Sequence, residues 1–126
     1  MSETRRVIYV EDNAANFALV QRVLESTGRY SVERAETGEL GLEMIRANTP
    51  DVILLDLDLP GISGIDVARE LRKDPRFGAV PIVVVTASVM KRERTMALDA
   101  GAEDFIEKPF DIADLRRRID AVLEGA

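Results

Sequence analysis

Five polar side chains in this sequence each lie at the end of a short apolar run: Glu11, Asp12, Asp56, Thr86 and Lys108. Three of them are carboxylates, which repel one another when they converge unless a cation lies among them. Mg²⁺ binds such oxygen ligands, typically one or two carboxylates together with waters or phosphate oxygens. An ammonium can pair with a phosphoryl oxygen, and a carboxylate can attack phosphorus to give an acyl phosphate. The set therefore favours Mg²⁺-dependent phosphoryl transfer, which needs mainly positioning and charge neutralisation.

The residue types that are missing narrow the chemistry further. The chain contains no Cys, which excludes disulfide scaffolds, thiolate nucleophiles and cysteine-bound zinc. It contains no His, which excludes His-based catalytic triads, His-ligated metals and a phosphohistidine on this chain. The net charge of −6 argues against the broad basic face that nucleic-acid binding requires.

The elements that must position these residues alternate along the chain. Apolar runs predict five strands, at 7–10, 30–32, 52–55, 82–85 and 105–106. Amphipathic stretches predict five helices, at 13–27, 37–47, 63–73, 88–100 and 111–123. Strict alternation predicts an α/β fold with an open parallel sheet, right-handed crossovers and helices on both faces. Ligands of such a sheet bind outside the carboxyl ends of its strands, and all five polar residues fall there.

The length and composition predict one domain. The 126 residues are 46% hydrophobic and 32% charged, which is enough apolar material for one core. No apolar run approaches the roughly 18 residues of a membrane span, and the N-terminus does not resemble a signal peptide. We expect a single domain over residues 1–126, with its core at about 6–123, no output domain and a location in the cytoplasm.

The motifs around the polar residues resemble the receiver domain of two-component response regulators, from about Arg6 to Leu123. The likeness rests on four segments that occur in order, each at a predicted strand end: Val10-Glu11-Asp12-Asn13, the stretch 54–64 (LLDLDLPGISG), Thr86-Ala87 and Lys108-Pro109-Phe110. The resemblance implies a flavodoxin-like (βα)5 three-layer sandwich with a five-stranded parallel sheet of order 2-1-3-4-5. It also implies a stand-alone receiver of the single-domain type.

The resemblance assigns roles in phosphoryl transfer. Asp56 matches the phosphoacceptor, Thr86 the hydroxyl that closes onto the phosphoryl group, and Lys108 the lysine that pairs with it. Phe105 matches the switch position, where an aromatic ring moves inward together with the threonine. The bond between Lys108 and Pro109 is implied to be cis.

The resemblance also implies a Mg²⁺ site. Asp12 matches a direct ligand and Glu11 a water-mediated one, and Asp56 and the backbone carbonyl of Asp58 complete the protein's share. Asp58 has two interpretations, because it lies two residues after the acceptor, where the family varies. Its carboxylate alters the lifetime of the phosphorylated state, or it is a solvated loop acid.

Partners follow from the same resemblance. The phosphoryl donor is a sensor histidine kinase or a histidine phosphotransfer protein. A downstream protein binds the face made by the fourth helix, fifth strand and fifth helix, where Lys91, Arg92 and Arg94 favour an acidic surface. Arg116–Arg118 fan around a helix, which favours a solvated face over direct nucleic-acid or membrane binding. The oligomeric state stays open.

A phosphorylation-dependent switch that is not a turnover enzyme is the leading hypothesis, and two others stay open. Asp56-Leu57-Asp58 also resembles the Asp-x-Asp motif of haloacid-dehalogenase-type phosphatases. That family places the motif near the N-terminus, however, and the chain has no room for a cap domain. The other alternative is a constitutive receiver-like interaction module, which the presence of all five site residues disfavours.

Overall fold

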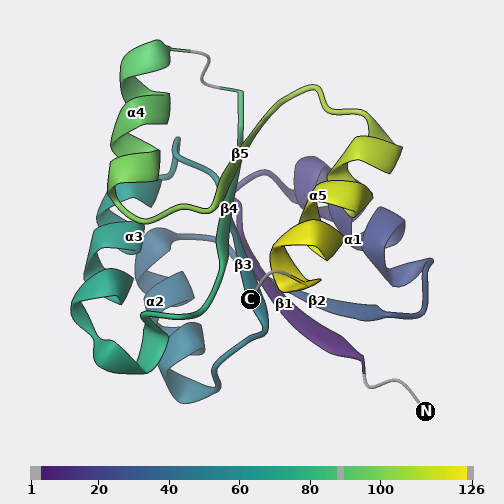
Figure 1. Cartoon of the computed structure of the whole chain (residues 1–126), viewed down its shortest axis with the longest axis horizontal. Coiled ribbons are helices and arrows are strands. Elements are labelled where there is room, and N and C mark those ends of the chain that lie inside the picture. Colours follow the sequence, from purple (N-terminus) through teal and green to yellow (C-terminus); the bar gives the residue numbers. More distant parts are fainter. Residues whose placement is uncertain (1–3, 88–89, 125–126) are drawn as a thin grey trace.

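Five parallel strands form the middle layer of the computed structural model, in which residues 4–87 and 90–124 are described (Figure 1). The strands are β1 (Arg5–Val10), β2 (Tyr30–Ala35), β3 (Val52–Leu55), β4 (Ile82–Thr86) and β5 (Asp104–Glu107). Their order across the sheet is β2-β1-β3-β4-β5, and every neighbouring pair is parallel. This confirms the predicted flavodoxin-like (βα)5 fold with strand order 2-1-3-4-5.

Helices cover both faces of the sheet. One face carries α1 (Ala14–Glu25) and α5 (Ile112–Glu124), and the other carries α2 (Gly38–Ala47), α3 (Gly64–Lys73) and α4 (Lys91–Asp99) (Figure 1). A short 3-10 turn, η1 (Pro75–Phe77), follows α3. None of the helices among the described residues is both long enough and apolar enough to cross a membrane.

Each face of the sheet has its own apolar core. Ile8 and Val10 of β1 belong to the core beneath α2, α3 and α4, whereas Val7 and Tyr9 belong to the core beneath α1 and α5. This division follows from the strand geometry, because successive side chains point to opposite faces. The same alternation directs Glu11, the residue after β1, toward the face that holds Tyr9.

Side-chain caps fix the starts of four helices. The backbone amides of the first turns donate to Asn13 before α1, Thr37 before α2, Ser63 before α3 and Asp111 before α5. Helix α4 differs, because Met90 precedes it and makes no side-chain cap. The predicted start of this helix was too early: Ser88 lies outside the described residues, and Met90 has an extended backbone, so the helix begins at Lys91.

Candidate functional site

All five polar residues expected at the site lie at one edge of the sheet. Glu11 and Asp12 follow β1, Asp56 follows β3, Thr86 is the last residue of β4, and Lys108 follows β5. The ends of parallel strands thus bring together residues that are up to 97 positions apart in the chain.

Backbone hydrogen bonds hold these strand ends in register. The Asp56 amide donates to the Val10 carbonyl over 3.1 Å, and the Lys108 amide donates to the Thr86 carbonyl over 2.8 Å. The hydrogen bonding between the strands therefore continues into the site, and the sheet itself fixes the backbone there.

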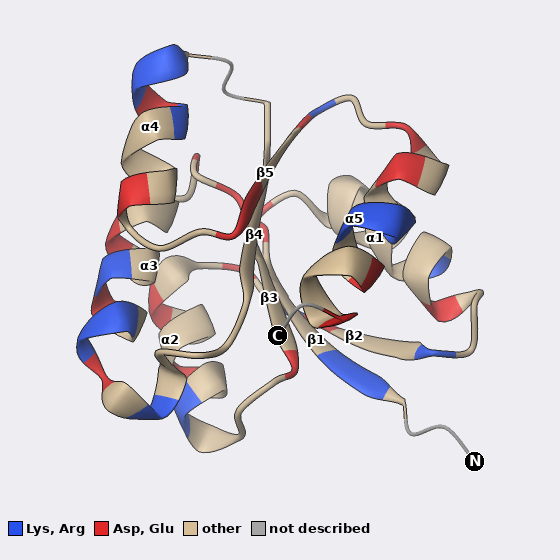
Figure 2. Ribbon diagram, viewed as in Figure 1, with Lys and Arg blue, Asp and Glu red and all other residues tan. Residues whose placement is uncertain are grey.

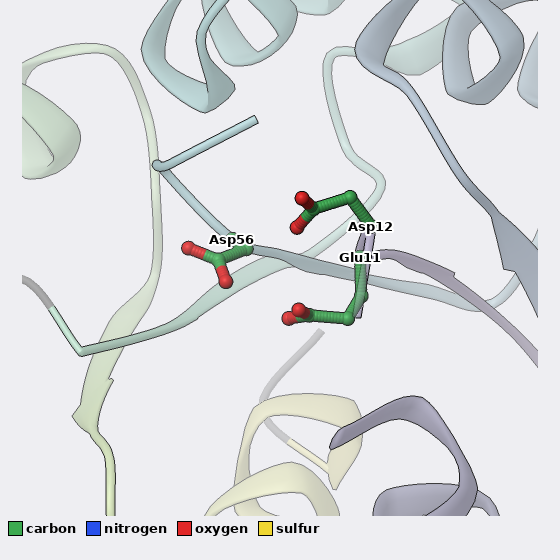
Figure 3. Close-up of side chains that lie close together, drawn as sticks. All are labelled: Glu11, Asp12 and Asp56. Carbon is green, nitrogen blue, oxygen red and sulfur yellow. The ribbon is translucent and has the colours of Figure 1, made fainter. Parts of the chain in front are cut away.

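Three carboxylates gather at this edge (Figure 3). Glu11, Asp12 and Asp56 each offer one oxygen, and these oxygens lie within 4.8 Å of one another. Glu11 and Asp56 are only 1% and 5% exposed, whereas Asp12 is exposed. When all three carboxylates are ionised, they carry three negative charges, and the ammonium of Lys108 offsets one of them. The remaining two match the charge of a divalent cation that prefers oxygen ligands.

Lys108 and Thr86 converge on the two oxygens of Asp56. The Lys108 Nζ donates to Asp56 Oδ2 over 2.9 Å and to Glu11 Oε2 over 2.8 Å. The Thr86 hydroxyl donates to Asp56 Oδ1 over 2.8 Å, and the Asp58 amide donates to the same oxygen over 3.0 Å. The carboxylate of Asp56 is therefore held in one orientation, with a cation and a hydroxyl beside it.

The electrostatics of the site favour an ionised Asp56. Burial by itself would raise the pKa of Asp56, but its contacts with Glu11, Lys108 and the Asp58 amide bring it below the usual range. Burial raises the pKa of the Glu11 carboxyl, and its neighbour Asp56 raises it further. Burial opposes the charge on Lys108, but hydrogen bonds to the two carboxylates raise its pKa above the usual value. The buried Asp56 side chain thus carries a negative charge at neutral pH, which a carboxylate nucleophile requires.

Asp58 lies at the margin of the site. Its side chain is exposed. Partial loss of hydration, together with the charge of Asp56, raises the pKa of its carboxyl. The two carboxylates therefore interact electrostatically, although Asp58 is not among the three that gather at the candidate metal position.

Phe105 lies on β5 in the core beneath α2, α3 and α4, and it is 3% exposed. The guanidinium carbon of Arg94 lies 5.6 Å from the centroid of its ring. The ring is therefore inside the protein and covered by a side chain of α4. The bond between Lys108 and Pro109 is cis, as the sequence resemblance implied.

Two residues that were not predicted from the sequence donate hydrogen bonds to the acidic pair Glu11 and Asp12. The Tyr9 hydroxyl donates to Glu11 Oε2 over 3.0 Å. The Arg34 guanidinium donates to the backbone carbonyls of Glu11 and Asp12, over 3.1 and 2.6 Å. Strand alternation could have indicated Tyr9, which lies two residues before Glu11 on the same face. No sequence signal marks Arg34.

A family model described as the response regulator receiver domain matches residues 7–120 of the chain. The transcriptional regulatory protein CseB of Streptomyces avermitilis is 38% identical over 123 residues, which are 98% of this chain and 51% of CseB. Protein PilH of Pseudomonas aeruginosa is 33% identical over 120 residues, which are 95% of this chain and 98% of PilH. The chain thus spans about half the length of the first relative and nearly all of the second.

A solved structure resembles the chain over nearly its full length. It is the receiver domain of a sensor histidine kinase from Pseudomonas aeruginosa, with a magnesium ion coordinated in its active site cleft. The TM-score is 0.88 at 30% sequence identity, and the match covers 97% of this chain and 99% of the other.

Proposed function

The chain belongs to the response regulator receiver domain family, and from this we propose that it is a phosphorylation switch whose phosphoacceptor is Asp56. Receiver domains of two-component systems are signalling switches, generally not turnover enzymes. They bind Mg²⁺ at an acidic pocket and interact with histidine kinases or phosphotransfer proteins and with downstream targets.

One observation carries the proposal, namely that Lys108 and Thr86 meet at the two oxygens of an ionised Asp56. In the proposed step, an Asp56 oxygen attacks the phosphorus of a phosphohistidine on the donor protein. An O–P bond forms, the P–N bond breaks, and the electron pair leaves with the donor imidazole. Lys108 and Thr86 then turn from the carboxylate to oxygens of the new phosphoryl group, where they neutralise its charge.

The donor set at the site fits Mg²⁺. Asp12 and Asp56 would hold the ion directly, Glu11 would hold it through water, and the backbone carbonyl of Asp58 would complete the protein ligands. When bound, the ion would offset the repulsion between these carboxylates and the incoming phosphoryl oxygens.

The downstream step would use the neighbouring strand. Thr86 ends β4, which pairs with β5, and Phe105 lies on β5 beneath Arg94 of α4. Movement of Thr86 toward a phosphoryl group would change the packing of Phe105, and with it the face formed by α4, β5 and α5. Basic residues begin α4 (Figure 2), so an acidic protein surface is the proposed partner there. The cytoplasm is the proposed location.

Intact-protein mass after incubation with acetyl phosphate tests the phosphoryl transfer. We expect one added phosphoryl group that requires Mg²⁺ and is absent in Asp56→Asn. An unmodified protein with unconsumed donor would instead indicate a constitutive interaction module. Rapid consumption of the donor and of unrelated phosphate esters, without an adduct, would indicate a phosphatase.

A further inference from the structure

Tyr9 is a buried polar residue that the proposed phosphoryl transfer does not use. It lies on β1 with 0% exposure, in the core beneath α1 and α5. Its ring packs against Phe17 of α1, with the ring centroids 6.0 Å apart and the planes inclined by 36°. This packing fixes the ring, and therefore also the position of the hydroxyl oxygen.

The hydroxyl of Tyr9 is directed at the acidic pair. It donates to Glu11 Oε2 over 3.0 Å, and the Lys108 ammonium donates to the same oxygen over 2.8 Å. The other oxygen, Oε1, accepts from the Asn13 amide over 3.2 Å. A glutamate has more rotatable bonds than an aspartate, so its carboxylate needs such contacts to stay in one place.

We propose that Tyr9 is a positioning residue for the metal site: its hydroxyl orients Glu11 toward Mg²⁺ and toward Lys108, and ion binding changes this contact. The inference rests on the proposed function, because it assigns Glu11 to the magnesium site. Lys108 links the same carboxylate to Asp56. A chain of hydrogen bonds thus runs from the core beneath α1 and α5 to the phosphoacceptor.

The direct test is the affinity of the protein for Mg²⁺, measured by titration calorimetry on Tyr9→Phe. This variant keeps the ring and removes only the hydroxyl. Loss of a partner that orients a metal ligand typically weakens binding tenfold or more, and we expect an increase in Kd of about tenfold. The matched control is Tyr30→Phe, because the Tyr30 hydroxyl donates to Asp120 and not to the site. Its Kd should equal that of the wild type.

A double-mutant cycle separates positioning from packing. In a Glu11→Gln background the ionised carboxylate is gone, and Tyr9→Phe should change the Kd by less than about twofold. A purely structural role of the hydroxyl would lower thermal stability by the same amount in both backgrounds and leave the Kd unchanged.

Intrinsic fluorescence gives a second measurement that leaves Tyr9 intact. The chain has two tyrosines and no tryptophan, so Tyr9 is the one strong fluorophore of the Tyr30→Phe variant. Tyrosine emission depends on what the hydroxyl donates to. We expect it to change with Mg²⁺ along a saturation curve that has the calorimetric Kd.

The outcomes separate the inference from the proposed function. Equal Kd values for Tyr9→Phe and the wild type would overturn the positioning role alone. So would a Tyr9 fluorescence that does not change when Mg²⁺ binds. A wild-type protein that binds no Mg²⁺ and accepts no phosphoryl group would overturn the proposed function, and the role of Tyr9 with it.

Discussion

Lys108 balances the charge of two carboxylates at once. Its ammonium contacts Glu11 and Asp56, and its side chain is only 12% exposed. A carboxylate buried beside a cation depends on that cation, because removing one partner leaves an uncompensated charge. Removal of Lys108 should therefore destabilise the fold, apart from the part that Lys108 has in the proposed phosphoryl transfer.

Replacement of Lys108 by methionine tests how far the stability of the protein depends on this positive charge. We expect Lys108→Met to lower the free energy of unfolding by about 3 kcal/mol without Mg²⁺, since Glu11 and Asp56 then face each other without a counter-ion. Added Mg²⁺ should restore more stability to this variant than it adds to the wild type, because the site is more negative. Chemical denaturation with and without the ion measures both values.

Lys73→Met is the matched control for this prediction. Lys73 pairs with Glu70 on the surface and is 72% exposed, so its replacement should change stability by less than about 0.5 kcal/mol. Equal effects of Mg²⁺ on Lys108→Met and on the wild type would show that the ammonium and the ion do not share these carboxylates.

Asp58 provides a second prediction for a single residue. Its carboxylate interacts with Asp56, so the loss of its charge should change the rate at which the phosphorylated protein loses its phosphoryl group. Phosphoprotein decay in Asp58→Asn and in the wild type, followed by intact mass, gives the two rates. Identical rates would leave Asp58 as a solvated loop acid without a part in the chemistry.

The five main site residues could be predicted because they follow clear apolar runs. Their meeting at one edge of the sheet follows from the common direction of the parallel strands alone. Alternation along β1 could have indicated Tyr9. Arg34 was missed for a physical reason, because its hydrogen bonds to the acidic pair depend on the conformation of a long side chain. The position of the Arg94 guanidinium over the Phe105 ring could not be predicted from the sequence either, because it depends on how α4 packs against β5.

The start of α3 lies against the loop that carries Asp56. A Cβ on Gly64 would lie 2.2 Å from the carbonyl oxygen of Asp56 and 2.9 Å from the Cα of Leu57. Both neighbours are backbone atoms, so they cannot move without shifting the loop. Gly64 therefore allows the helix to approach the site closely.

We expect Gly64→Ala to destabilise the protein by about 2 kcal/mol or more, because a close contact with backbone forces a shift of the chain. Phosphorylation of Asp56 should slow as its loop moves. Thermal denaturation and the rate of phosphorylation by acetyl phosphate check the two effects.

Gly78→Ala is the control, because a Cβ there has only the Pro75 carbonyl as a neighbour, at 3.8 Å. It should change neither quantity appreciably. A Gly64→Ala protein with the stability and phosphorylation rate of the wild type would show that the loop has room to move.

Among the elements, the central strands matched their predictions best. β3 is buried along its length, so its apolar run coincides with its bounds of Val52–Leu55. The edge strand β2 continues to Ala35, beyond the predicted end at residue 32, because one of its faces is exposed and admits polar residues such as Glu33. β5 likewise begins and ends with acidic residues that an apolar run cannot reveal.

Of the helices in the described part of the chain, α4 is the one that buries the fewest side chains against the core. Its buried residue is Ala97, its N-terminus has no side-chain cap, and its sequence is mostly polar. In contrast, α1 buries Phe17, Val20, Val23 and Leu24. Stability is distributed unevenly in such a structure, and local opening occurs where buried apolar contacts are few.

Hydrogen exchange should therefore be faster in α4 than in α1 or α5. We expect the amides of Lys91–Asp99 to exchange at least tenfold faster than those in the middle of α1, since opening α4 exposes less apolar surface. Exchange followed by NMR on the unmodified protein measures this difference. Equal protection of α1 and α4 would argue against α4 as the element that responds to a change at Phe105.

The location of the phosphoryl group tests the central claim most directly. Borohydride reduces an acyl phosphate to an alcohol, so a phosphorylated aspartate becomes homoserine, which peptide mass spectrometry can identify. After phosphorylation with acetyl phosphate and Mg²⁺, we predict homoserine at position 56 and at no other carboxylate. Homoserine at position 12 or 58, or reduction at none of the aspartates, would contradict the assignment of Asp56 as phosphoacceptor.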